Sequence, residues 1–164
     1  MELLHRLLGH DSWTTHQFLE LCASLTDNEI DHEFDIAHRS IRRTLDHVVW
    51  NIECWTDLMQ KRQVRTRDTD SSMESLGRRF QTATEEFHSV ALKVFDEGRL
   101  DECYLDVLDR PPKEKSMGGT ILHVVTHGMH HRAHLMYMLR RLGVSDIPDG
   151  DVLTWEQSVG RHHD

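Results

Sequence analysis

The chain has 164 residues, 38% of them hydrophobic, and a formal net charge of −9 with its histidines neutral. This length fits one domain over residues 1–164, and apolar residues spread along all of it exclude a disordered polypeptide. The acidic charge, with no stripe of lysine and arginine, argues against nucleic-acid binding because a phosphate backbone would be repelled.

The first half of the chain predicts two long helices with a short turn between them. Apolar residues recur at helical spacing over about residues 2–23, and Thr26 or Asp27 could cap a short helical turn. Ser40 is suited to cap a second long helix, which should fade near residues 60–65. Its apolar positions follow at spacings of 4, 3, 4, 3 and 4: Ile41, Leu45, Val48, Ile52, Trp55 and Met59. This spacing is typical of a helix that packs in a bundle.

The second half predicts two more long helices. A third helix is expected over about residues 73–95, and Gly98 suits its end. In the connection that follows, residues 104–108 alternate in polarity and could be extended. A fourth long helix is expected over about residues 120–142, capped by Thr120, with a short helix near 152–159. These elements predict an all-α protein: an antiparallel four-helix bundle with a longer connection between helices 3 and 4 and a short C-terminal helix.

The chain carries no signal for a membrane or for export. No stretch approaches the roughly 20 apolar residues of a membrane span. The N-terminal MELLHRLLGHDSW lacks the long apolar run of a signal peptide. The three cysteines, Cys22, Cys54 and Cys103, are odd in number and widely spaced, which suits a reducing compartment. We therefore expect a cytoplasmic protein with no membrane contact.

Histidine is the outlier of the composition, with 14 residues. Three pairs lie four residues apart on the fourth predicted helix: His123/His127, His127/His131 and His130/His134. A four-residue step rises about 6 Å, so two imidazoles at that spacing can share one metal ion. An eight-residue step of about 12 Å is too long, so a third ligand must come from another element. Spacing does not choose between the three pairs.

A solvated polar face that happens to be rich in histidine is the alternative interpretation. The same helix, however, carries enough apolar residues that much of its surface must be buried: Ile121, Leu122, Val124, Val125, Leu135, Met138 and Leu139. Burying several unpaired imidazoles is costly, and a shared metal ion removes that cost. The pattern therefore favours a metal site.

Two blocks of the sequence resemble the DinB family of bacterial proteins, the YfiT-like metal-binding four-helix bundles. SIRRTLDHVVWNIECW matches the family's serine-led helix with a single histidine and a later tryptophan. HVVTHGMHHRAHLMYMLRRLG matches the family's last helix, with its H-x-x-H-H-R pattern and L-R-x-L-G end. The resemblance covers nearly the whole chain. One departure is Ala133-His134, where the family has Gly-Gln.

The resemblance implies that the metal ligands are His47, His127 and His131, which satisfies the need for one adjacent pair and a distant third. Three imidazoles leave open positions on one divalent ion. Zn or Ni is expected, but imidazole suits Cu and Fe as well, so nitrogen ligands alone do not identify the metal. Polar groups near the site, expected to bind a cofactor, are Asn51, His130 and His134. No residue stands out as catalytic.

Characterised relatives include thiol transferases and isomerases that use a small thiol such as bacillithiol or mycothiol. The resemblance thus implies an enzyme whose metal activates a low-molecular-weight thiol for transfer to an electrophilic small-molecule substrate. The alternatives are a metal-dependent hydrolase using metal-bound hydroxide, and a non-catalytic metal- or ligand-binding protein of the stress response. Thiol dependence separates the first from the second, and tight metal binding without turnover indicates the third. A homodimer is expected because relatives often pair through their helices.

The remaining polar candidates have structural interpretations. Arg132 is expected to pair with a carboxylate such as Asp46 or Glu53. Solvent exposure is expected for six other histidines: His5, His10, His16, His32, His38 and His88.

Overall fold

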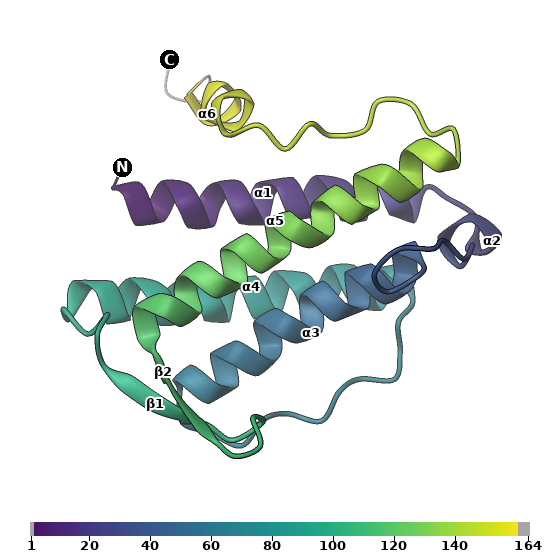
Figure 1. Cartoon of the computed structure of the whole chain (residues 1–164). Helices are drawn as coiled ribbons and strands as arrows, with labels where there is room; N and C mark the ends of the chain where they lie inside the picture. The colour runs from purple at the N-terminus through teal and green to yellow at the C-terminus, as the bar shows by residue number, and fades with distance from the viewer. Residues whose placement is uncertain (1, 161–164) are drawn as a thin grey trace.

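A computed structural model describes residues 2–160 of the chain (Figure 1). Over these residues six helices and two strands follow in the order α1 (Leu3–Ala23), α2 (Asp27–Ile30), α3 (Ile41–Met59), α4 (Met73–Asp96), β1 (Cys103–Asp106), β2 (Lys113–Ser116), α5 (Met117–Arg141) and α6 (Val152–Gly160). No helix among them is both long enough and apolar enough to cross a membrane. The predicted order of elements is confirmed, including the extended residues after α4 and the short final helix.

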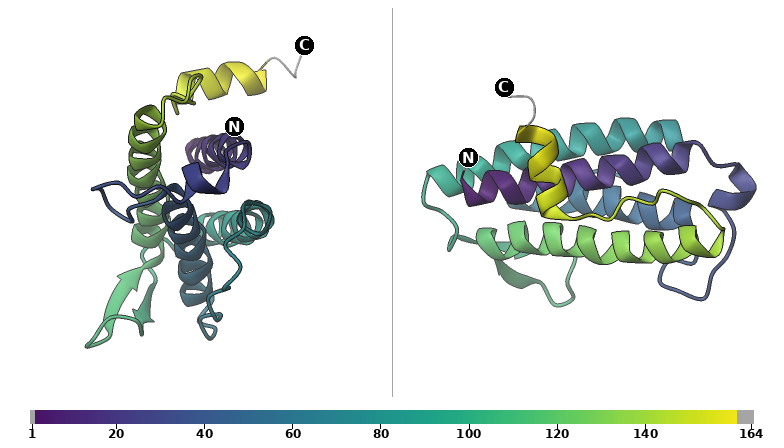
Figure 2. Two further views of the ribbon diagram at one scale, coloured as in Figure 1. Left: turned by 90° about the vertical axis from the view of Figure 1, so that its right-hand side faces the viewer. Right: turned by 90° about the horizontal axis from the view of Figure 1, so that it is seen from above.

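The four long helices form the predicted bundle, in which α1 and α3 each lie against both α4 and α5. Helices α1 and α5 run in one direction, and α3 and α4 run in the other (Figures 1 and 2). The predicted antiparallel arrangement does not hold for α3 and α4, which follow one another in the chain and run parallel. The periodicity of the apolar residues gives no sign of this. The two helices are parallel because residues 60–72 return along the bundle before α4 begins. An extended segment of this length reaches about 40 Å, more than the roughly 28 Å of a 19-residue helix.

Hydroxyl caps set where the helices that carry the site begin. The Ser40 side chain accepts a hydrogen bond from the Arg43 amide at 3.3 Å, as predicted for the start of α3. Helix α5 begins three residues earlier than predicted, at Met117. There the Ser116 side chain, not that of Thr120, caps the helix by accepting from the Gly119 amide at 3.2 Å. Strands β1 and β2 pair antiparallel just before this start.

A buried carboxylate fastens the segment that returns from α3 to α4. Asp57, near the end of α3, is 1% exposed and accepts hydrogen bonds from the Arg65 amide at 2.8 Å and the Arg62 guanidinium at 2.6 Å. The Arg65 guanidinium also donates to it at 2.6 Å. Burial alone would raise the pKa of Asp57, but the hydrogen bonds from Arg65 and Arg62 outweigh it and lower the pKa to about 2.

This lowered pKa predicts an acid-dependent contribution to stability. The folded pKa lies below the ordinary value of 3.8, so the contribution is present above that value and is lost as the pH falls through about 2. We expect Asp57→Asn to lower the free energy of unfolding by about 2 kcal/mol at neutral pH, with the difference from wild type shrinking below pH 4. Urea unfolding at several pH values measures it. Asp35→Asn, which removes an exposed charge, is the control, and a difference that is constant with pH would contradict the prediction.

Candidate metal centre

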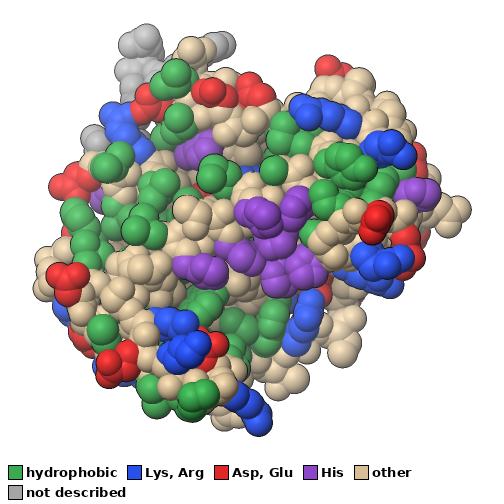
Figure 3. All heavy atoms as spheres, in the orientation of Figure 1, with side chains coloured by type: hydrophobic (Ala, Val, Ile, Leu, Met, Phe, Trp, Pro, Cys, Tyr) green, Lys and Arg blue, Asp and Glu red, His purple; other side chains and the backbone are tan. Residues whose placement is uncertain are grey.

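The histidine-rich face of α5 meets α3 in the middle of the bundle. In Figure 3 the histidine side chains gather into one patch on the face where these two helices lie. His131 is 6% exposed, and His127 and His47 are partly buried. The α5 face is built by the four-residue spacing, which stacks His123, His127 and His131 along one side of the helix. His47 lies on α3 at the same height in the bundle, where its ring contacts that of His127.

The structure brings together the three histidines that the family resemblance singled out. The Nε2 atoms of His47 and His127 are 3.0 Å apart, and the Nε2 atoms of His127 and His131 are 3.1 Å apart. Imidazole nitrogens bound to one zinc ion at about 2.0–2.1 Å lie roughly 3.0–3.4 Å from one another. The two measured separations therefore suit ligands that share one ion.

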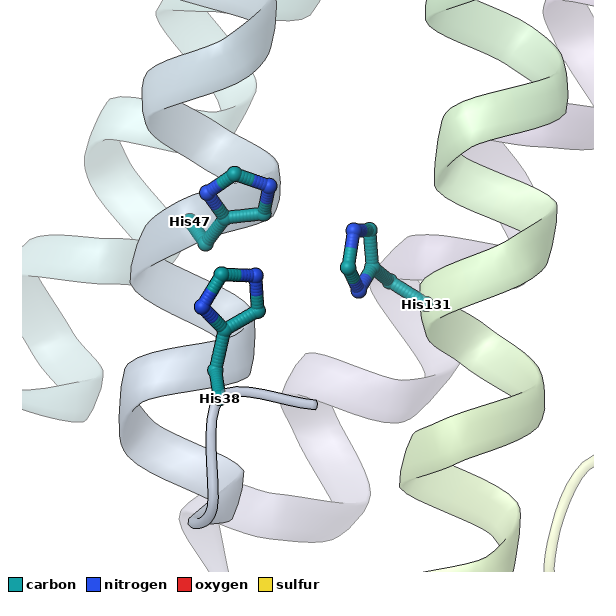
Figure 4. Close-up of side chains that lie close together, drawn as sticks. All are labelled: His38, His47 and His131. Atoms are coloured by element: carbon teal, nitrogen blue, oxygen red, sulfur yellow. The ribbon is translucent and has the colours of Figure 1, made fainter. Parts of the chain in front are cut away.

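His38 is a fourth member of the cluster and corrects the expectation that it is solvent exposed. It lies on the loop between α2 and α3, and its ring centroid is 3.9 Å from that of His47 and 5.1 Å from that of His131. One ring nitrogen from each of His38, His47 and His131 lies within 4.8 Å of the others, a group that could hold a metal ion and that does not include His127. His127 joins it through its Nε2 contacts with His47 and His131. Figure 4 shows the His38 and His47 rings side by side, facing His131 across the gap between the helices.

The contacts within this cluster are ill suited to hydrogen bonding alone. A neutral imidazole nitrogen carries either one proton or one lone pair. The Nε2 atom of His127, which touches those of both His47 and His131, can thus form a good hydrogen bond with only one of them. A cation that accepts a lone pair from each nitrogen satisfies all three. These shared Nε2 contacts fit a metal ion better than an empty polar network. The other ring nitrogen of His131, Nδ1, is buried without a hydrogen-bond partner among the described residues.

Burial keeps these imidazoles neutral. It lowers the pKa of His47 to about 4, with His38 and Arg67 adding to the effect. Burial, together with the neighbouring histidines, lowers the pKa of His127 to about 4 and that of His131 to about 3. At neutral pH their lone pairs are therefore available to a metal ion, which only a deprotonated ring can bind.

The residues expected to bind a cofactor lie on the same two helices. Asn51 follows His47 by one turn on α3, and its Oδ1 atom is buried without a hydrogen-bond partner among the described residues. The ring of His134 is 5.5 Å from that of His131, and its Nδ1 atom is likewise buried and unpaired. His130 is exposed, 4.3 Å from His134 between ring centroids. Their role as cofactor ligands stays a prediction.

An open cleft of about 390 Å³ lies at the hairpin end of the histidine column. Trp55 and His123 line one part of it, and Lys115, Ser116 and Thr120 line another. The ring centroids of Trp55 and His123 are 5.1 Å apart, and that of His123 is 5.4 Å from that of His127. The sequence held one signal for this cleft: the four-residue spacing from His127, which puts His123 on the same face of α5. The hairpin's contribution had no signal in the sequence.

Arg132 has a different partner from those predicted. Its guanidinium donates to the Asp11 carboxylate at 2.6 Å and to the Thr15 hydroxyl at 2.8 Å, so it ties α5 to α1. The carboxylates of Asp46 and Glu53 instead accept from Arg79 on α4. His10 and His88 are also partly buried, not exposed as expected, and His10 contacts the Gly150 carbonyl at 2.8 Å.

Comparison with known proteins agrees with this architecture. No curated protein matches the chain. Among solved structures, a DinB-like protein from Bacillus cereus shares the fold with a TM-score of 0.65 and 16% identity, over 85% of this chain and 90% of that one. The sequence model of the DinB family matches residues 1–158. The chain therefore belongs to the DinB family.

Proposed function

We propose that the protein binds one divalent metal ion through His47, His127 and His131. The observation that carries this proposal is the pair of Nε2 contacts, 3.0 Å and 3.1 Å, which meet at His127. All three donors are imidazole nitrogens, which suit Zn, Ni, Cu and Fe, and of these we propose Zn or Ni. The three nitrogens approach one another from two facing helices, α3 and α5, which supports the proposal.

We further propose that the site serves transfer of a low-molecular-weight thiol to an electrophilic small molecule. When bound, a metal ion with an open position lowers the pKa of a thiol and so supplies a thiolate nucleophile. The Oδ1 atom of Asn51 is buried without a hydrogen-bond partner among the described residues, and a donor group of the thiol compound would satisfy it. The cleft beside His123 and Trp55, at about 390 Å³, is of a size that admits a small substrate next to the column.

A test uses cysteine as the thiol probe and monobromobimane as the electrophile, with the protein loaded with Zn²⁺ or Ni²⁺. In this reaction a sulfur–carbon bond forms, the carbon–bromine bond breaks, and bromide and the thiol proton are released. We expect fluorescence to grow faster with loaded protein than with metal-free protein or with His127→Ala. Equal rates in all three samples would contradict thiol transfer.

The same samples separate the alternative functions. Metal-dependent cleavage of nitrophenyl acetate in the absence of any thiol would favour a hydrolase in which water is the nucleophile. Stoichiometric metal binding with neither activity would favour a binding protein of the stress response. Both results would leave the three-histidine site in place.

We also propose a homodimer. Exposed apolar side chains on α1 and α5 support it: Leu3, Leu122 and Met129 are 81%, 58% and 59% exposed. Apolar surface of this kind is stabilised when a second copy covers it. Light scattering should give twice the chain mass of 19.3 kDa, and a single chain mass would overturn the proposal.

A further inference from the structure

The loop between α2 and α3 places a fourth imidazole beside the three proposed ligands. We propose that His38 is an exchangeable ligand of the same ion and occupies the position that an incoming thiol takes. This inference rests on the proposed metal site. It adds a residue that lies on a loop, whereas the three proposed ligands lie on helices, and it makes this residue control access to the ion.

The position of His38 fits ligation. Its ring packs against that of His47, with 3.9 Å between centroids and 31° between ring planes, and its centroid is 5.1 Å from that of His131. One of its nitrogens lies within 4.8 Å of a nitrogen of His47 and one of His131. Figure 4 shows the ring turned toward the same space that His131 enters from α5.

The backbone on both sides of His38 holds an unusual conformation that aims the side chain inward. Ala37 and Arg39 have φ values of 40° and 70°, in the left-handed region that residues with a Cβ rarely adopt. Three backbone hydrogen bonds keep the loop closed: Phe34 N to Arg39 O at 2.7 Å, Arg39 N to Ile36 O at 2.8 Å, and Ser40 N to His38 O at 2.9 Å. Strained backbone of this kind persists where surrounding contacts enforce it, and it is common at functional sites.

The His38 ring itself is held much less firmly than its backbone. Within residues 2–160 no hydrogen bond joins its imidazole to another group, and the residue is partly exposed. The other three imidazoles project from the long helices α3 and α5. Each of those three makes an Nε2 contact with a neighbour, whereas a rotation of the His38 side chain takes it out of the cluster without breaking such a contact.

Four imidazoles would complete a tetrahedral zinc site and leave no open position. At four-coordinate zinc a thiol then binds by replacing one imidazole, and His38 is the one that we assign to depart. The sulfur of the thiol takes the place of the His38 nitrogen on the ion, and the thiol proton passes to solvent. The loop thus makes access to the ion depend on one mobile side chain.

The test uses Co²⁺-loaded protein, whose visible absorption reports the ligands of the ion, and azide as a probe of the open position. We expect His38→Ala to keep one Co²⁺ per chain but to change the spectrum. Azide should bind about tenfold more tightly to it, if the position is free in about one wild-type molecule in ten. His32→Ala, an exposed histidine on the same loop, is the matched control and should behave as wild type.

The outcomes separate this inference from the site on which it rests. The role of His38 would be overturned if His38→Ala kept the wild-type spectrum and azide affinity. If His127→Ala lost the ion in the same experiment, the three-histidine site would still stand. A wild-type protein that binds no Co²⁺ would overturn both. His38→Asn is a second variant that keeps a polar side chain at this position. Equal thermal unfolding of the metal-free proteins shows that each variant is folded.

Discussion

His127→Ala is expected to abolish stoichiometric binding of a divalent metal. The His127 Nε2 atom contacts those of both His47 and His131, so its loss leaves two nitrogens without the group that joins them. In wild type, metal at 100 times its dissociation constant should stabilise the fold by about 2.7 kcal/mol. For a chain of this size that raises the melting temperature by about 5–10 °C, and the variant should show no such rise.

Mass spectrometry of metal content and thermal unfolding with and without a chelator measure this result. His47→Ala should behave in the same way, because the third ligand comes from α3. His16→Ala is the control, since its side chain is exposed on α1. A variant at His47 or His127 that keeps one ion per chain would show that the proposed ligands are wrong.

Arg132→Met is expected to destabilise the protein by about 3–5 kcal/mol, whether or not metal is present. Arg132 and Asp11 are 5% and 7% exposed, so the substitution leaves a buried carboxylate without its cation. Burial raises the pKa of Asp11, and Arg132 opposes that rise. The melting temperature should fall by about 6–20 °C.

The double variant Asp11→Leu with Arg132→Met separates the cost of an unpaired charge from the value of the pair. It should recover most of the lost stability, because an apolar pair of similar volume can replace a buried ion pair. The prediction for Arg132→Met would be contradicted if chemical denaturation showed that the free energy of unfolding falls by less than about 1 kcal/mol. Gly128→Ala is a milder probe of the same contact, since an added Cβ would lie 3.0 Å from an Asp11 oxygen.

Local signals were enough to predict most helices, because each depends on residues close in sequence. Ser40 and the apolar spacing after it agree on one helix, and the structure confirms α3. The start of α5 was missed by three residues because two hydroxyls compete as caps, and only the hairpin before it favours Ser116. The parallel direction of α4 depends on the path of residues 60–72, which has no periodic pattern to read.

The site was predictable in part for the same reason. Four-residue spacing identified the α5 column, and the family resemblance supplied His47. Neither spacing nor the resemblance pointed to His38. Its position depends on left-handed backbone at Ala37 and Arg39, and neither alanine nor arginine favours that conformation. Helix geometry could have identified the partner of Arg132. Arg132 follows His131 by about 100° around the helix, so Arg132 faces α1 when His131 faces α3.

The contact between His47 and His127 joins positions 80 residues apart in the chain. A bond between two such positions removes about 4–5 kcal/mol of chain entropy from the unfolded state. An ion held there is therefore a removable cross-link, and proteases act on the opened chain in proportion to its population. The supply of metal would then set how long each molecule survives in the cell, whatever reaction the site performs.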